Sequence, residues 1–286
     1  MSIFTNDRIF IPDNGDVTQA IKKTTHLAIA AHQDDVEIMA QHGILECFGQ
    51  KDAHFSAVVI TDGAGSPRTG IYEAYNDEEM KNVRLREQKK AAIIGEYAAL
   101  FLLKYPSAVL KDAKERRVID DLKEILLETR PKIVYTHNPA DKHETHVAAS
   151  LRTLAALREI STEYVPERVL GCEVWRNLDW VNDDEKTVLD ISDRPALKAA
   201  LLGVFDSQIE GGKRYDLASL GRYCANATFY ESHDTDRMTA ACYAIDLTPL
   251  VKEGDVTAYI KSYIDRFSRN VEKMINKLEG KTPSAY

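Results

Sequence analysis

The stretch Leu27-Ala-Ile-Ala-Ala-His-Gln-Asp-Asp-Val-Glu37 joins a short apolar run to a cluster of polar side chains. A continuous apolar run of this length, bounded by polar residues, is typical of a strand buried on both faces of a parallel sheet. In open α/β sheets, ligands bind just beyond the carboxyl ends of such strands. His32, Asp34, Asp35 and Glu37 stand at that end. The stretch therefore predicts an α/β fold with its functional site at the carboxyl rim of the sheet.

The acidic residues of this cluster have a simpler explanation as the first turn of a helix. Carboxylates there stabilise the helix through its dipole, which explains one or two of the three. The dipole does not explain His32, because a helix N-terminus disfavours a protonated imidazole. We therefore favour a metal or catalytic cluster over a capped helix start.

Buried-strand patterns alternate with helical patterns through the first 160 residues. Further strands are expected at 55–60, 97–103 and 132–136, and helices at 36–48, 76–95, 113–128 and 147–159. This alternation predicts a doubly wound, mostly parallel sheet flanked by helices. Right-handed crossovers place all its strand-end loops along one rim. The cluster at 32–37 and the segment 137–146 should therefore meet in space.

The C-terminal part carries weaker signals. We expect a single domain over 1–286, with the motif-bearing core at about 25–160 and a C-terminal elaboration at about 161–286. Residues 206–247 give no clear pattern. A long amphipathic helix is expected at about 248–278, with an apolar stripe that packs on its own domain or, as the alternative, forms a homo-oligomer contact.

Composition narrows the class of protein. The 286 residues carry a net charge of −8, which argues against a general nucleic-acid partner or an acidic membrane surface. No apolar stretch reaches membrane-spanning length, and we see no signal peptide. The four cysteines form no C-x-x-C pair, which favours buried thiols in a reducing compartment. We expect a soluble, cytoplasmic protein.

Two pairs of residues have the spacing of metal ligands. His32 and Asp35 are three apart at one strand end, and His143 and His146 are three apart near a helix start. A catalytic zinc site takes three protein ligands from histidine and carboxylate, and leaves a fourth position for water. Asp34 and one histidine then remain for proton transfer. The spacing alone does not decide which histidine is the ligand.

Three motifs resemble those of one known family, the LmbE-like (PIG-L) metal-dependent N-acetylglucosaminyl deacetylases. Ala31-His-Gln-Asp-Asp-Val-Glu37 resembles the signature A-H-P-D-D-x-E, and Asp141-Lys-His-Glu-Thr-His146 resembles D-x-H-x-D-H. Arg84-Leu-Arg-Glu87 is similar to the family's R-x-x-E helix. The resemblance spans roughly residues 25–160. It implies a Rossmann-like sheet with the site on the strand-end rim.

The resemblance also implies roles for individual residues. It makes Asp34 the general base and His143 the general acid or oxyanion partner, and it lets Arg84 contact sugar hydroxyls. The implied metal is Zn2+, with another divalent transition metal as the alternative. The implied ligands are His32, Asp35 and His146.

The motifs depart from the family pattern at three places. One is Gln41-His42, which stands where many members have small residues or glycine, so the helix after the site is expected to pack differently. Gln33 replaces the usual proline and is expected to loosen the turn. Thr145 replaces an aspartate that orients the catalytic histidine, so Glu144 or Asp141 would have to take that role. Glu37 either contacts His32 and holds it in position for the metal, or is only a carboxylate in the first turn of the helix. We favour the first.

These observations predict a metal-dependent hydrolase that uses a metal-activated water. Its substrate is expected to be a small glycosyl compound or glycoconjugate of the N-acetylglucosaminyl type, from which it removes the N-acetyl group. One alternative is an amidase with the same metal centre that acts on a bulkier conjugate. Another is a catalytically silent protein that binds sugar or metal. The aglycone, the native metal and the oligomeric state are left open.

Overall fold

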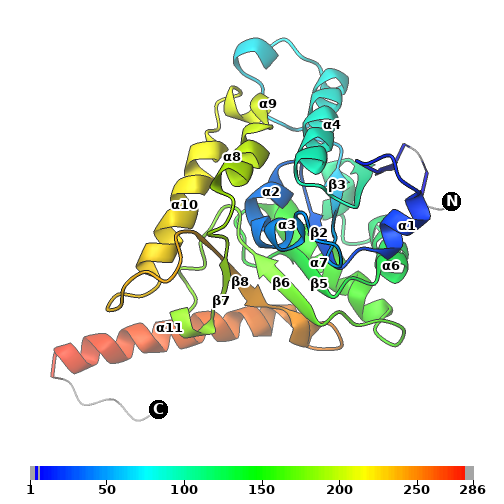
Figure 1. Cartoon of the computed structure of the whole chain (residues 1–286). Helices are drawn as coiled ribbons and strands as arrows, with labels where there is room; N and C mark the ends of the chain where they lie inside the picture. Colours follow the sequence, from blue (N-terminus) through cyan, green and yellow to red (C-terminus); the bar gives the residue numbers. More distant parts are fainter. Residues whose placement is uncertain (1–3, 6, 281–286) are drawn as a thin grey trace.

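The computed structural model of the chain describes residues 4–5 and 7–280. One sheet lies at its centre between two layers of helices, with its strands in the order β1-β4-β3-β2-β5-β6-β8-β7 (Figure 1). The strands are β1 (Ile9–Phe10), β2 (His26–Ala30), β3 (Phe55–Thr61), β4 (Ala99–Tyr105), β5 (Ile133–His137), β6 (Arg168–Cys172), β7 (Thr187–Asp190) and β8 (Ala241–Asp246). The α/β fold predicted from the sequence is confirmed.

The sheet is mixed around a parallel centre. Strands β2 to β6 pair in parallel, whereas β1 pairs antiparallel with β4, and β8 pairs antiparallel with both β6 and β7. From β2 the chain adds β3 and β4 on one side, and then adds β5 and β6 on the other. The strand order therefore reverses between β2 and β5. Such a reversal leaves a crevice at the carboxyl ends of the two strands, where ligands bind.

Helices cover both faces of the sheet. One face packs against α2 (Asp35–Met39), α3 (Gln41–Cys47), α4 (Asp77–Ile94), α8 (Pro195–Gly203) and α10 (Tyr215–Phe229). The other packs against α1 (Val17–Lys22), α5 (Ser107–Lys111), α6 (Arg117–Thr129), α7 (Glu144–Glu159) and the start of α11 (Val256–Leu278). Alternate residues of β2 enter the two cores, with Leu27 and Ile29 on one side and Ala28 and Ala30 on the other. This double burial explains the continuous apolar run.

Two helices differ from those expected. The helix expected at 36–48 is two helices, because Ala40 leaves helical geometry with φ −113° and ψ 24°. The second of these, α3, packs closely on β5, since a Cβ at Gly43 would stand 2.7 Å from the Tyr135 ring. The long C-terminal helix begins at Val256 rather than at 248. Gly254 has φ +112°, which ends the preceding turn, and Asp255 then caps α11.

Residues 206–247, which gave no sequence pattern, form α9 (Asp206–Ile209), α10 and β8. Strand β8 extends the sheet next to β6. Helix α9 contacts the loop after β3, where the Tyr72 hydroxyl donates to Asp206 at 2.6 Å. Helix α10 contacts α2, where the Tyr223 hydroxyl donates to the Ile38 carbonyl at 2.7 Å. Both helices are thereby held near the carboxyl rim of the sheet.

Two expectations about the chain as a whole can be compared with the described residues. None of the helices in this part of the chain is both long and apolar enough to span a membrane. The four cysteines are free thiols; Cys47, Cys172 and Cys242 are buried and Cys224 is exposed.

Candidate active site

A cavity of about 270 Å³ opens where the strand order reverses, at the carboxyl ends of β2 and β5. Its walls come from the segments after β2, β3 and β5, from α4, and from residues 174–222. It brings together six residues predicted from the sequence: His32, Asp34, Asp35, Arg84, His143 and His146. Glu37 and Glu144 do not line it.

The turn after β2 directs its two aspartates to different partners. Asp34 has φ +85°, which is unusual for a residue with a side chain and must be held by its surroundings. Its backbone N–H donates to Gln88 at 3.2 Å, and the Gln33 amide donates to the Thr61 carbonyl at 2.9 Å. Gln33 therefore ties the turn to β3, and the expectation that it loosens the turn is wrong.

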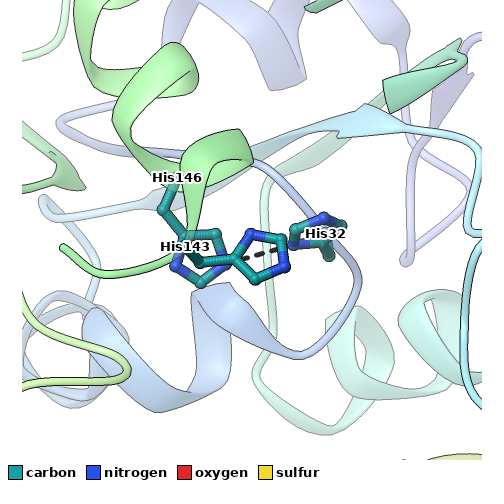
Figure 2. A group of neighbouring side chains, drawn as sticks. All are labelled: His32, His143 and His146. Carbon is teal, nitrogen blue, oxygen red and sulfur yellow. Dashed lines mark hydrogen bonds between the residues drawn. The ribbon is translucent and has the colours of Figure 1, made fainter. Parts of the chain in front are cut away.

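Three residues that line the cavity bring four possible ligand atoms close together. His32 Nδ1 lies 3.1 Å from His146 Nε2, and Figure 2 shows these two rings together with His143. The Asp35 carboxylate lies beside both histidines, with Oδ2 3.2 Å from His32 Nδ1 and Oδ1 3.3 Å from His146 Nε2. Tetrahedral zinc with bonds near 2.1 Å would place its ligands about 3.4 Å apart. At these distances His32, Asp35 and His146 suit a single divalent ion.

The charge around His146 also favours a cation. Its other ring nitrogen, Nδ1, lies 3.5 Å from Asp141, which can fix the tautomer that leaves Nε2 free to bind metal. Burial alone would lower the pKa of His146, but Asp35 and Asp141 outweigh it and raise the pKa to about 10. Two carboxylates thus stabilise a positive charge at this position, as a proton or as a metal ion.

His137 is a further buried histidine that the sequence analysis left aside. It stacks on His146 with ring centroids 4.0 Å apart, and its Nε2 lies 3.4 Å from Asp35. The same Nε2 accepts a hydrogen bond from the Ala31 N–H at 3.0 Å. Burial lowers the pKa of His137 to about 4, so the ring is neutral. Its place at the end of β5, the neighbour of β2, was the signal that could have identified it.

Asp34 forms an ion pair with Arg84 on α4. Arg84 is 1% exposed, and its Nη2 donates to the Asp34 carboxylate at 2.8 Å. Burial raises the pKa of Asp34 to about 6, while Arg84 acts in the opposite direction. The other Arg84 nitrogen, Nη1, donates to Glu87 at 3.0 Å and to Ser207 at 3.4 Å. In this structure Arg84 holds the Asp34 carboxylate, and its predicted contact with substrate remains a prediction.

Replacing Arg84 by methionine is expected to destabilise the protein by about 3–5 kcal/mol, because Asp34 and Glu87 lose their buried counter-charge. Urea unfolding measures the change. Arg86→Met is the matched control, since Arg86 is exposed on the same helix and should change stability by less than about 0.5 kcal/mol. Equal effects of the two substitutions would contradict a structural role for the Arg84 ion pairs.

Helix α9 completes this network, which the sequence analysis missed. The Ser207 N–H donates to Glu87 Oε1 at 2.7 Å, and the Ser207 hydroxyl donates to Glu87 Oε2 at 2.8 Å. Glu87 in turn holds Arg84. Because Ser207 is 120 positions from Glu87, no local pattern could have found this contact.

Glu37 is buried, but it does not contact His32. Tyr97 and Gln88 donate to its Oε1 at 2.6 and 2.8 Å, and Gln88 also accepts the Asp34 N–H. Burial raises the pKa of Glu37 to about 8. Glu37 therefore supports the Asp34 turn through Gln88, and the expected support of His32 is corrected.

Glu144 lies outside the site. Its side chain is 87% exposed and its carboxylate is 3.8 Å from Lys111. Successive helical residues are rotated by about 100°, so Glu144 faces almost opposite to His146 on α7. The expectation that Glu144 orients a catalytic histidine is wrong. The Asp141 carboxylate accepts the backbone N–H of His143 at 2.8 Å and contacts the ring of His146.

His143 lies beside two of the candidate ligands, His32 and His146. Its ring centroid is 5.0 Å from that of His32 and 4.6 Å from that of His146. Burial and the two neighbouring histidines lower the pKa of His143. The neighbouring residue Thr145 supplies no carboxylate that would raise this pKa. The His143 imidazole is therefore neutral.

The comparisons with known proteins agree with this geometry. The family model of PIG-L, described as GlcNAc-PI de-N-acetylase, matches residues 27–157. That range contains every candidate metal ligand and the Asp34–Arg84 pair. No curated protein matches the chain.

Several solved structures share the fold. N,N'-diacetylchitobiose deacetylase from Pyrococcus horikoshii is 18% identical, with a TM-score of 0.60 over 79% of this chain and 85% of that one. The 4-carboxy-2-hydroxymuconate hydratase GalB from Pseudomonas putida KT2440 is 18% identical, with a TM-score of 0.60 over 81% and 99%. Teicoplanin deacetylase Orf2, solved in its zinc-inhibited form, is 16% identical, with a TM-score of 0.57 over 78% and 97%.

At these identities the likeness shows the fold alone, and the hydratase shows that one fold can serve different reactions. The family assignment therefore depends on the matched segment and its motifs. Residues 27–157 are a domain of the PIG-L, or LmbE-like, family.

Proposed function

We propose that the chain is a metal-dependent N-deacetylase that hydrolyses the acetamido group of an N-acetylglucosaminyl-type compound. One observation carries the proposal. Three candidate metal ligands, His32, Asp35 and His146, line the same cavity as the buried Asp34 carboxylate, which forms a separate ion pair. A family domain of de-N-acetylases and deacetylases of the same fold support it.

His32, Asp35 and His146 are the residues that would hold the metal. A bound divalent ion, zinc or another transition metal, would supply a Lewis acid that polarises the amide carbonyl and acidifies water. The zinc-inhibited state of one structural neighbour is a reason to test several ions rather than zinc alone.

Asp34 is suited to be the general base. With its pKa raised to about 6 by burial, it is ionised at neutral pH and is a stronger base than an ordinary carboxylate. The ion pair with Arg84 fixes which way its oxygens point. Asp34 would take the proton from the attacking water and later return it to the leaving amine nitrogen.

His143 is suited to stabilise the oxyanion. As a neutral imidazole it can donate one hydrogen bond to the oxygen on which charge develops. The lowered pKa of His143 favours this role over that of a permanently protonated acid.

The size of the cavity favours a small substrate group. About 270 Å³ lies just below the range of typical pockets for drug-sized ligands, roughly 300–1,000 Å³. A single acetamido sugar suits this volume better than a bulky amide enclosed as a whole. The bulkier conjugate therefore remains an alternative only if most of it stays outside the cavity.

Acetate release tests the proposal directly. Protein stripped with a chelator should release no acetate from N-acetylglucosaminyl compounds, and adding back Zn2+, Co2+, Ni2+ or Mn2+ should restore release with at least one ion. Equal release before and after stripping would contradict the metal role. A stoichiometric metal without any release would favour the bulkier amide, tested with a panel of such amides, or the silent binder.

A further inference from the structure

We propose that the outer part of the cavity binds an anionic group on the sugar, a phosphate or a carboxylate, through Lys142, Lys213 and Arg222. This inference rests on the proposed function, because it assumes that the acetamido group occupies the metal end. It names the class of substrate: an acidic N-acetylglucosaminyl compound rather than a neutral one.

An aromatic corner separates the two ends of the cavity. Trp175 and Tyr215 both line it, and their rings meet edge to face with centroids 5.7 Å apart. Aromatic faces of this kind pack against the apolar face of a sugar ring. Both residues lie outside the segment that matches the family, so this wall is a feature of the C-terminal part of this chain.

Two lysines from different loops, next to the cavity but not among the residues that line it, approach the same aromatic ring. Lys142, before α7, and Lys213, before α10, each place Nζ 5.5 Å from the centre of the Trp175 ring. Arg222 on α10 lines the cavity and donates through Nη1 to the Val174 carbonyl at 2.6 Å, next to Trp175. Two cations therefore lie near the Trp175 ring, and a third donates a hydrogen bond to the backbone of the residue before it.

Among the described residues, these cations form no close ion pairs, although Arg222 acts at longer range to lower the pKa of Glu173, which burial raises. In the described part of the chain, none of the three forms an ion pair within 4.0 Å. Arg84, by contrast, is neutralised by Asp34 and Glu87. The outer end of the cavity is thus positive, in a chain whose net charge is −8.

Asp141 and Glu173, two carboxylates near Trp175, are occupied or deeply buried. Asp141 accepts the His143 N–H and contacts His146, so it serves the metal end. Glu173 is buried and accepts a hydrogen bond from the Asn138 amide, and burial raises its pKa to about 8. Neither forms an ion pair with the three cations.

The geometry of the cations suits either kind of anion. Lysine ammonium groups act as flexible point charges and do not demand the planar, two-pronged geometry that arginine prefers. A phosphate monoester or a carboxylate can therefore satisfy them. The experiment below distinguishes a phosphate from a carboxylate on the sugar.

The test compares wild-type protein with the double variant Lys142→Gln/Lys213→Gln. The substrates are N-acetylglucosamine, its 1-phosphate and 6-phosphate, and N-acetylmuramic acid, which carries a carboxylate. We expect wild type to favour at least one acidic sugar over the neutral one in kcat/KM, and the double variant to lose about tenfold on that sugar. The value for the neutral sugar should change by less than about twofold. Preference for the phosphates or for the muramic acid identifies the anion.

A second charge-matched variant controls for net charge. Lys51→Gln/Lys252→Gln removes two exposed lysines away from the cavity and should leave the preference for the acidic sugar unchanged. Equal kcat/KM for neutral and acidic sugars in wild type, or an unchanged preference in the Lys142/Lys213 variant, would overturn the inference.

Binding measured by calorimetry separates this inference from the proposed function. Titrating glucosamine 6-phosphate, glucosamine 1-phosphate, muramic acid and neutral glucosamine requires no turnover. If no sugar releases acetate but wild type still binds an acidic sugar more tightly in a lysine-dependent way, the proposed function fails and the inference stands. If neutral and acidic sugars bind equally, the inference fails whatever the activity.

Discussion

Asp34→Asn is expected to lower kcat by about a thousandfold while the metal remains bound. General-base catalysis by a positioned side chain contributes about 10²–10⁴ in rate, and asparagine cannot accept the proton. Asparagine has nearly the same shape and can still accept the hydrogen bond that Arg84 Nη2 now donates at 2.8 Å. Metal content measured by mass spectrometry on the same sample separates loss of the base from loss of the ion.

Asp62→Asn is the matched control for this experiment. Asp62 follows β3, as Asp34 follows β2, but it pairs with Lys81 at 3.3 Å and does not line the cavity. The control should retain activity within about threefold. If Asp34→Asn itself stayed within tenfold of wild type, another group would have to be the base.

His146→Ala is expected to abolish metal binding and, with it, activity. His146 belongs to the proposed ligand set with His32 and Asp35, and it is also shared by two alternative groups, one with His32 and His143 and the other with Asp35 and His137. Removing it leaves too few protein ligands for a stable site in each case. Equilibrium dialysis of the variant should give less than about a tenth of the wild-type metal content. Full occupancy would overturn the assignment of His146 as a ligand.

Two further variants separate the alternative ligand groups. His32→Ala should lose the metal, because His32 Nδ1 faces His146 Nε2 at 3.1 Å. His137→Ala should retain most of it, since His137 Nε2 already accepts the Ala31 N–H. The reverse pattern would place the ion in the deeper group. His233→Ala, on an exposed loop, controls for loss of a histidine in general.

The centre of the fold and the floor of the site could be predicted from local sequence. A buried parallel strand must be apolar on both faces, so the run 27–31 can be recognised as a strand from the sequence. The carboxyl ends of parallel strands necessarily share one rim. The distance of His143 and His146 from that run along the chain did not matter, because β2 and β5 are neighbours.

The surroundings of the site could not be predicted in the same way. Arg84 stands in a run of charged residues on α4 that resembles a solvated face, and its burial depends on Asp34, 50 positions away, and on Ser207, 123 positions away. Helix α10 owes its place to contacts with α2 and β8, so its own periodicity is weak. The prediction for Glu144 was wrong for a local reason. On a helical wheel Glu144 and His146 point in nearly opposite directions, so both cannot face the site.

The reversal of strand order between β2 and β5 divides the cavity between two stretches of the chain. The metal-binding group and Asp34 come from residues 32–146, whereas Trp175, Tyr215 and Arg222 form the opposite wall from the C-terminal part. The residues proposed for the reaction and those proposed for selectivity therefore lie in separate segments, which meet at the cavity and are held together by contacts such as Ser207–Glu87, Tyr72–Asp206 and Tyr223–Ile38. Such a division allows one segment to diversify while the other is held constant, and it makes residues 173–222 the natural unit to exchange when redesigning what this domain accepts.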